Sequence, residues 1–495
     1  MRIRPADSTA SLAFIHATVI DVETGKLRVD MTVLVSANRI ASVESSGVAS
    51  FPMGTHVIDG RGKYLVPGLW DMHVHAFTSP ESTLTLGARA TDVYFPQFLA
   101  AGVTGIRDMG GWVDTVMGVR RRVRNHEVLG PRIVAAGRLF GGKNPWAPSS
   151  PHVWVVTTPD SARFAVDSMK RAGADFIKVH DFLSRDVYLA IAAAARAAAL
   201  PLVGHLQPRV KVADAIAAGQ IGMEHMPIEL IVACAGGGTS EVNAFYDQWR
   251  KGGWPEFVRG TAALWRARKP ANCAETMGAM KSAGVHLTPT LVLRMHDSTL
   301  YRRVPVADLT LAAATRCSED VNDWSKTPDS LRTLYYTTVL DVVRVFHEAG
   351  VGILAGTDGP GGCLVPGWAL HEELENFVKA GLSPLQALQT ATIEPARFMG
   401  MSDSLGTVEA GKVADLVLLD ANPLADVRNT RRVAGVVVDG RWQGRDELRS
   451  LSARARHSLS NQTRSTSPGY NPPNGRSNWT RKEPGKFAGL FDRIN

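Results

Sequence analysis

The sequence predicts an α/β protein: a (β/α)8 barrel of the TIM type, joined to a small β-sandwich domain built from both ends of the chain. Two observations lead to this fold. Short apolar runs alternate with helical patterns between residues 65 and 358, and β-branched stretches at 12–66 and 405–443 flank that region. Alternating strands and helices favour a parallel sheet, and eight such units are typical of a barrel.

The elements follow in order along the chain. After a first strand at 65–73, the predicted barrel strands are GVTGIRDMGG, PRIVAAG, FIKVHD, PLVGHL, IGMEHM, VHLTPTL and VGILAGTDG. Helical patterns such as SARFAVDSMKRAG and SRDVYLAIAAAARAAAL separate most of them. We therefore expect the sandwich to comprise residues 1–66 and 403–445, with the catalytic barrel at 67–402.

The positive charge is concentrated in the C-terminal segment. The chain of 495 residues has a formal net charge of +8, and residues 445–495 contain ten Lys or Arg against four Asp or Glu, which leaves about +2 elsewhere. Residues 446–495 are rich in Ser, Asn, Pro and Arg, so we expect a disordered tail. A nearly neutral body and sparse aromatics in the tail predict no nucleic-acid partner.

Cysteine usage and hydropathy bear on the compartment. Cys234, Cys273, Cys317 and Cys363 are far apart and form no CxxC pattern, so we expect no disulfide framework and a reducing environment. No run approaches the roughly 18 apolar residues of a membrane helix, and the N-terminus lacks the apolar core of a signal peptide. These features predict a cytoplasmic protein with no membrane partner.

Two connections exceed the usual length of a strand-helix loop. Residues 138–158 follow the third predicted strand and residues 226–271 follow the sixth, and both leave from the catalytic face of the barrel. Such loops shape a substrate pocket or a lid, or serve as packing insertions and oligomer contacts.

Polar side chains stand at the ends of five predicted strands. They are His73 and His75 in PGLWDMHVH, Lys178 in DFIKVHD, His205 in PLVGHL, His225 in IGMEHM and Asp358 in ILAGTDGP. In a parallel barrel these ends open onto one face, and residues i and i+2 of a strand share a side. A lone histidine at a strand end is more often a core residue, but this combination predicts a binuclear metal site. His180 is an extra histidine, for which we expect a supporting or structural role.

These motifs, together with LGTVEAGKVADLVLLDANPLADVRNTRRVAGVVVDG and HEELENFVKAGLSPLQALQTATIEPARFMG, resemble the amidohydrolase superfamily, specifically its imidazolonepropionase-related, prolidase-like branch. The resemblance covers residues 12–445. It implies that His73, His75 and Asp358 hold one divalent metal ion, most simply Zn²⁺, and that His205 and His225 hold the other. Lys178 would bridge both as a carbamate formed with carbon dioxide.

The chemistry explains these residue types. A free lysine, with a reference pKa near 10.4, would repel two cations, whereas burial exposes the neutral amine that carbon dioxide captures. A hydroxide bridging the metals then attacks a polarised carbonyl. Asp358 would act as general base and then as acid toward the leaving nitrogen, or serve only as a ligand.

Other candidate residues are His152, Arg294 and His296. The resemblance places His152 where a histidine binds the substrate carbonyl. The alternative is that His152 is a surface histidine of the loop. Arg294 and His296 could bind a substrate carboxylate, or the arginine could simply be solvated. In relatives, glycine comes directly after the histidine of the EH motif. This chain has Met226 and a long insertion at that point, which weakens the expectation of prolidase specificity.

We therefore expect a metal-dependent hydrolase that cleaves an amide bond in a small molecule, such as a dipeptide or an N-acyl amino acid, and that forms a homo-oligomer. The alternatives are a lactonase or esterase, a urea or carbamate hydrolase, and a non-catalytic scaffold relative. A mononuclear deaminase would not need a bridging Lys178.

Overall fold

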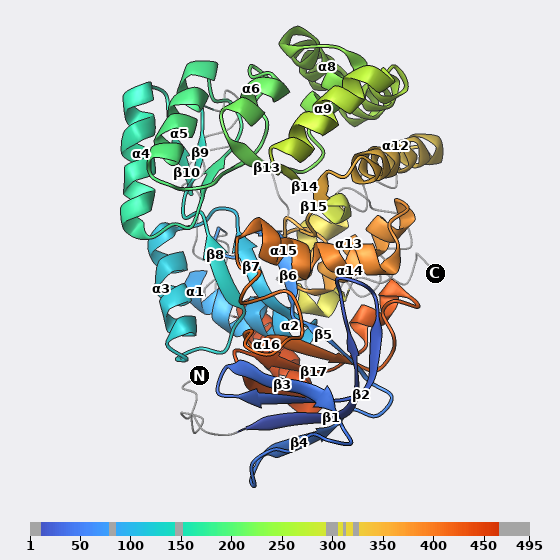
Figure 1. Cartoon of the computed structure of the whole chain (residues 1–495). Coiled ribbons are helices and arrows are strands. Elements are labelled where there is room, and N and C mark those ends of the chain that lie inside the picture. Colours follow the sequence, from blue (N-terminus) through green and yellow to red (C-terminus); the bar gives the residue numbers. More distant parts are fainter. Residues whose placement is uncertain are drawn as a thin grey trace.

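The computed structural model describes residues 11–78, 86–143, 152–293, 305–309, 313–319 and 326–464. Figure 1 shows an α/β arrangement, with a sheet of blue and red strands at one end and parallel strands surrounded by helices at the other. The α/β class predicted from the sequence is confirmed.

Both ends of the chain contribute to one eight-stranded sheet. Its main order is β18-β17-β16-β5-β1-β2-β3, and β4 pairs with β1. The antiparallel pairing of β16 with β5, which sets Val417 opposite Val66, joins the two ends. Phe14, Val33 and Leu416 belong to its buried apolar cluster. The two-sheet sandwich stays a prediction. The strands are β1 (Leu12–Ile20), β2 (Leu27–Ser36), β3 (Arg39–Ser45), β4 (His56–Asp59), β5 (Tyr64–Pro67), β16 (Leu416–Leu419), β17 (Val433–Val438) and β18 (Arg441–Gly444).

The remaining strands are parallel and form two sheets, with the orders β6-β7-β8 and β10-β9-β11-β12-β13-β14-β15. Backbone contacts link them, because Val74 bridges to Gly359 and Met72 N donates to Ala355 O just after β15. The strands are β6 (Leu69–Val74), β7 (Val103–Asp108), β8 (Arg132–Ala135), β9 (Leu139–Gly141), β10 (Val153–Val155), β11 (Ile177–Val179), β12 (Leu202–Gly204), β13 (Gln220–Glu224), β14 (His286–Thr288) and β15 (Gly352–Ile353).

Helices occupy most connections between these strands. In α4, Thr158 and Ser161 form a capping box, Pro159 occupies the first turn and Gly173 ends the helix with a φ of 86°. These are local signals that the sequence supplies. The helices outside the insertion are α1 (Leu86–Arg89), η1 (Ala90–Tyr94), α2 (Phe95–Ala100), α3 (Val113–Arg124), α4 (Pro159–Ala172), α5 (Arg185–Ala197), α6 (Val212–Ala217), η2 (Leu291–Leu293), η3 (Val306–Asp308), α12 (Asp329–Glu348), α13 (Trp368–Lys379), α14 (Pro384–Thr390), α15 (Ile393–Phe398) and η4 (Val427–Arg431).

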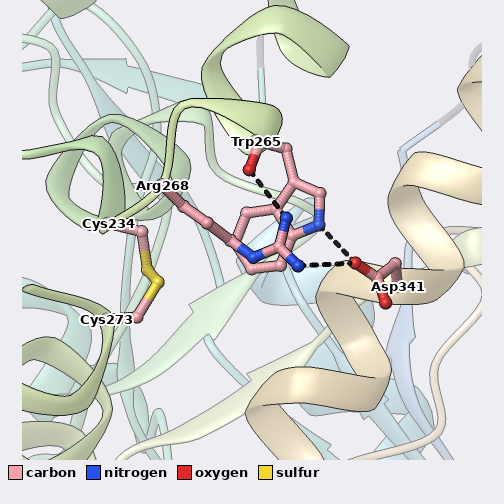
Figure 2. Close-up of a disulfide and its surroundings, with 5 residues drawn as sticks. All are labelled: Cys234, Trp265, Arg268, Cys273 and Asp341. Carbon is pink, nitrogen blue, oxygen red and sulfur yellow. Dashed lines mark hydrogen bonds and ion pairs between the residues drawn. A yellow bond between two sulfur atoms is a disulfide. The ribbon is translucent and has the colours of Figure 1, made fainter. Parts of the chain in front are cut away.

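The long segment after β13 is helical. It contains α7 (Ile228–Ala235) and α8 (Thr239–Arg266), followed by α9 (Pro270–Ser282), and Gly253 kinks α8 with a φ of 65°. We call residues 226–282 the helical insertion. Trp265 Nε1 donates to Asp341 Oδ2 at 2.7 Å, which fixes the insertion against α12 (Figure 2). The expectation of a loop over 226–271 is therefore wrong.

Two disulfides correct the expectation of unpaired cysteines. Cys234 of α7 bonds to Cys273 of α9 (Figure 2), and Cys317 bonds to Cys363. The pairs are 39 and 46 residues apart in sequence, so tertiary packing rather than a short motif brings them together.

The C-terminal segment also differs from the prediction. Residues Arg445–Arg464 form α16, and Leu448, Leu451, Ala455 and Leu459 are buried. These residues recur every three or four positions, so they make one apolar helix face that the polar composition concealed. Arg456 Nε also pairs with Asp308 Oδ1 at 2.5 Å. The expectation of disorder is therefore wrong for 446–464, and residues 465–495 lie outside the described ranges.

Within the described ranges, no helix combines the length and the apolar character needed to cross a membrane.

Candidate metal centre

The six predicted ligands lie at or just after the carboxyl ends of five parallel strands. His73 lies one residue before the end of β6 and His75 follows the strand, Lys178 is in β11, and His205 and His225 follow β12 and β13. Asp358 lies five residues after β15. Because parallel strands present these ends on one side, side chains from distant parts of the sequence meet there.

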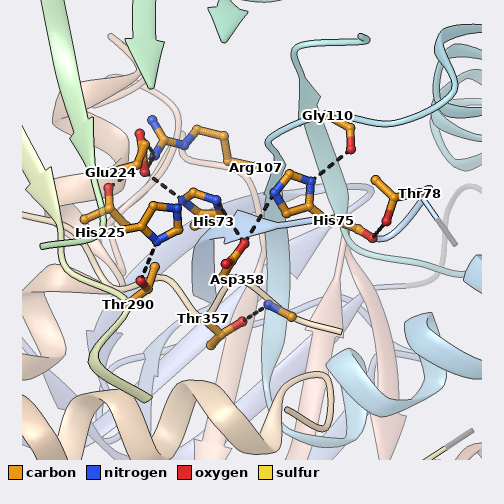
Figure 3. Close-up of polar contacts among 12 residues, drawn as sticks. His73, His75, Thr78, Arg107, Gly110, Glu224, His225, Thr290, Thr357 and Asp358 are labelled. Atoms are coloured by element: carbon orange, nitrogen blue, oxygen red, sulfur yellow. Dashed lines mark hydrogen bonds and ion pairs between the residues drawn. The ribbon is translucent and has the colours of Figure 1, made fainter. Parts of the chain in front are cut away.

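A first cluster is centred on Asp358. Its Oδ1 lies 3.2 Å from His73 Nε2 and 3.3 Å from His75 Nε2 (Figure 3). Potential ligand atoms of His73, His225 and Asp358 all lie within 4.8 Å of one another. The structure therefore brings together the three residues assigned to the first metal and adds His225, which had been assigned to the second.

A second cluster surrounds His205. Ligand atoms of His180, Asp181 and His205 lie within 4.8 Å of one another, and the His180 and His205 rings are 4.4 Å apart between centroids. The His205 and His225 rings are 4.8 Å apart, so His225 stands between the two clusters. Burial, assisted by His205, lowers the pKa of His180 to about 3, which leaves its imidazole neutral.

Each of the four predicted histidine ligands has its Nδ1 occupied by a protein partner. The partners are Glu224 Oε2 at 2.8 Å for His73, Gly110 O at 3.0 Å for His75, Asp181 Oδ1 at 2.6 Å for His205 and Thr290 Oγ1 at 2.8 Å for His225. If Nδ1 carries the proton, it donates to each acceptor and the Nε2 lone pair is free to bind a cation.

Two buried nitrogens provide an independent test of whether a metal fits. In the described structure, Lys178 Nζ is a buried polar atom without a hydrogen-bond partner, and His73 Nε2, which faces Asp358 Oδ1 at 3.2 Å, has no well-aligned one. Burial lowers the pKa of Lys178 to about 8, although Glu224 and Asp358 oppose this shift. A buried polar atom without a partner is costly, and a bound cation and a carbamate would satisfy these two. The residues present therefore fit a metal centre with a modified lysine.

Backbone conformation turns two of the site residues toward this face. His225 has a φ of 66° and Asp358 a φ of 62°, values in the left-handed region that non-glycine residues seldom adopt. Backbone hydrogen bonds hold both residues: His225 N donates to Thr288 O, and Asp358 N donates to His73 O, each at 2.7 Å. Such strain concentrates at functional sites.

Sequence reasoning missed the residues that support the ligands. Arg107 Nη2 donates to Glu224 Oε1 at 2.9 Å and to Thr288 Oγ1 at 3.2 Å, while its Nε donates to Met72 O at 2.6 Å. Burial would raise the pKa of Glu224, but Arg107 and His73 hold it well below its usual value. Glu224 therefore stays ionised and orients His73 (Figure 3). The sequence does contain one signal for these supporting acids, which is that each is the direct neighbour of a histidine: Glu224 precedes His225 and Asp181 follows His180.

The remaining candidates are only partly covered by the structure. His152 is half-buried, and its pKa is lowered to about 4 by burial, with the charges of His75 and Arg138 contributing. Arg294 and His296 lie outside the described residues.

A cavity of about 970 Å³ opens beside the candidate metal ligands. His205, Glu224, His225 and Thr290 line it on one side, and α7, α8 and α12 contribute its other walls. The cavity is large enough for a small organic molecule. The helical insertion therefore lies where it can contact a substrate.

Comparisons with known proteins identify the family of this chain. The family model described as the amidohydrolase family matches residues 64–443, so the chain belongs to the amidohydrolase family. Curated relatives match over short stretches. Adenine deaminase 2 of Jannaschia sp. is 45% identical over 51 residues, which are 10% of this chain and 8% of that protein. N-acetylglucosamine-6-phosphate deacetylase of Caenorhabditis elegans is 31% identical over 122 residues, covering 21% and 29%.

Solved structures match over most of the chain. A putative prolidase from Bifidobacterium longum superposes with a TM-score of 0.63 at 27% identity, covering 90% of this chain and 99% of that one. Bottromycin amidohydrolase gives a TM-score of 0.71 at 22% identity, covering 92% and 91%. An Xaa-Pro dipeptidase, determined with methionine in its active site, gives 0.62 at 21% and covers 88% and 100%. The structural neighbours are thus prolidase and amidohydrolase-type proteins, as the resemblance implied.

Proposed function

We propose that this member of the amidohydrolase family is a two-metal hydrolase that cleaves an amide bond in a small molecule, such as a dipeptide or an N-acyl amino acid. The observation that carries the proposal is the convergence of four imidazoles, one lysine and one carboxylate, with all four Nδ1 atoms already paired. The similarity to a putative prolidase supports an amide substrate.

Each residue has a distinct task in this proposal. His73, His75 and Asp358 would hold one cation, His205 and His225 the second, and Lys178 as a carbamate would join both. His225 also lies close enough to the first cluster to be shared. When bound, two divalent cations such as Zn²⁺ would supply Lewis-acid activation of the carbonyl and acidify a water to a pKa near 7.

Asp358 is the candidate for moving the proton. Burial would raise its pKa, yet His73 and His225 hold that pKa well below the usual value, so the carboxylate is ionised, as both a metal ligand and a general base must be. In amide hydrolysis its oxygen would take the proton of the attacking water and deliver it to the leaving nitrogen. His152 would donate to the substrate carbonyl oxygen.

The proposal includes a closed (β/α)8 barrel as the support of this site. The parallel order of the two sheets, the bridge between Val74 and Gly359 and the hydrogen bond from Met72 N to Ala355 O support that closure.

A substrate screen tests the function. Zinc-loaded protein would be assayed against dipeptides, N-acyl amino acids, lactones and carbamates, with His205→Ala as the inactive control. We expect the highest kcat/KM for an amide. Faster turnover of lactones or carbamates would contradict the proposed bond type, and no turnover of any compound would favour a non-catalytic relative.

A further inference from the structure

One buried acid in the cavity has no task in the metal centre. Glu229, in the first turn of α7, lines the cavity yet is only 3% exposed. The other fully buried acid that lines it, Glu224, is already engaged by His73 and Arg107. Glu229 comes instead from the helical insertion.

Within the described residues, the groups that influence the Glu229 carboxyl group are a tyrosine hydroxyl, its own backbone and another carboxylate. Tyr246 of α8 donates its hydroxyl to Oε1 at 3.2 Å, and the groups that shift the pKa of Glu229 include no lysine, arginine or histidine. Burial raises that pKa to about 8, and the negative charge of Asp181 adds to the shift. Asp181 lines the same cavity as Glu229 and is hydrogen-bonded to His205, so the two carboxyl groups share this cavity. Such a carboxylate is stabilised when it gains a proton or a cationic partner.

Aromatic rings line the same part of the cavity. Tyr246, Trp249 and Phe257 of α8 and Tyr335 of α12 all contribute to its wall. The Trp249 and Phe257 ring centroids are 4.9 Å apart, and those of Tyr246 and Trp249 are 6.0 Å apart. Aromatic faces attract organic cations, and the attraction is strongest where water is excluded.

Basic residues occupy a different position in the cavity. Lys143 and Arg209 line it but are exposed, whereas Glu229 is buried. Arg250, also exposed, pairs with Asp247 of its own helix. Among the side chains that line the cavity, the basic ones thus lie toward solvent and Glu229 lies deeper, so a group that reaches the interior meets a buried acid beside aromatic rings.

We propose that Glu229, together with the aromatic residues Tyr246, Trp249, Phe257 and Tyr335, binds a cationic end of the substrate, such as an ammonium or guanidinium group on a flexible arm. This inference rests on the proposed function and specifies it: the preferred substrate is an amide that carries a basic group on one side of the scissile bond. Glu229 acts here as a specificity-determining residue and takes no part in bond cleavage.

The kinetic test uses substrates matched in shape and different in charge. N-acetyl-arginine and N-acetyl-citrulline differ in a guanidinium and a ureido group, and both belong to the proposed class of N-acyl amino acids. In the zinc-loaded wild type we expect kcat/KM to favour N-acetyl-arginine by about 10- to 100-fold, the range of a charge-assisted hydrogen bond. Glu229→Gln should bring the ratio near one. Tyr246→Phe should lower it by about 2- to 5-fold, the effect of one neutral hydrogen bond.

Glu256→Gln serves as the matched control, because Glu256 is on α8, pairs with Arg259 and has a side chain that is 45% exposed. It should keep the wild-type ratio. A wild-type ratio near one, or an unchanged ratio in Glu229→Gln, would overturn the inference.

A binding measurement separates this inference from the catalytic proposal. Calorimetry would compare pentylguanidinium with its neutral isostere pentylurea, using zinc-loaded wild type and Glu229→Gln. Tighter binding of pentylguanidinium that depends on Glu229 supports the cation site even if no amide is hydrolysed. Amide hydrolysis without any preference for the cation, in either assay, leaves the catalytic proposal standing and overturns the cation site.

Discussion

The strand ends and the helical insertion face the same cavity but are built differently. At the strand ends, His73 and Lys178 are buried, and each of the four candidate ligand imidazoles has its Nδ1 paired with a protein partner. In the insertion, Trp249 and Phe257 are half-buried on a helix that kinks at Gly253. We infer that residues at the strand ends carry out catalysis and that the insertion selects the substrate. Mutations at the strand ends should therefore lower metal content and kcat, whereas mutations in the insertion should change the preference between substrates.

The largest effect is expected at the ligands. His73→Ala removes a buried candidate ligand from the first cluster, so it should lose metal and lower kcat by more than about 100-fold, above the loss typical for a residue that only supports a ligand. His56→Ala, exposed on β4 at the far end of the molecule in Figure 1, is the control and should keep both. Full activity in His73→Ala would remove the distinction between the two regions.

A smaller loss is expected where a residue only orients a ligand. Asp181→Asn removes the charge of the acceptor 2.6 Å from His205 Nδ1, so metal affinity should fall about 10- to 100-fold. Metal titration with a competing chelator measures this change. Asp186→Asn, exposed on α5, should bind metal as the wild type does, and equal affinities for both variants would show that the Asp181 contact does not support the site.

The sequence predicted the strand ends better than the insertion, for a physical reason. Ligands such as His73 and Asp358 stand at the ends of apolar runs, and parallel topology alone brings those ends together. Glu229 and Tyr246 are 17 residues apart on two helices whose packing has no short motif. The sequence does not predict the disulfides, because their pairing depends on tertiary packing. The polar composition of α16 predicts disorder, whereas the helical spacing of Leu448, Leu451 and Leu459 predicts the buried face that the structure shows.

The helix α16 gives a test in a third region, where stability alone should change. Leu451 is 8% exposed, so Leu451→Ala should lower the free energy of unfolding by about 2–5 kcal/mol, whereas deletion of residues 465–495 should leave it nearly unchanged. Denaturant unfolding measures both. Metal content should be the same in each, and an unaffected stability in Leu451→Ala would show that α16 does not dock as described.

The disulfide in the insertion sharpens the comparison further. Replacing both Cys234 and Cys273 by Ser should lower the unfolding free energy by about 2–4 kcal/mol, because the unfolded insertion gains freedom, while the metal content stays that of the wild type. Mass spectrometry of the unreduced wild type checks the pairing first. Loss of metal in the double variant would show that the insertion and the strand ends depend on each other.

The metal content of the purified wild-type protein, measured by elemental analysis alongside its activity, tests the central claim most directly. The account predicts close to two divalent ions per chain, loss of activity when a chelator removes them, and recovery when zinc and bicarbonate are returned. Wild-type protein that remains fully active without metal would contradict it.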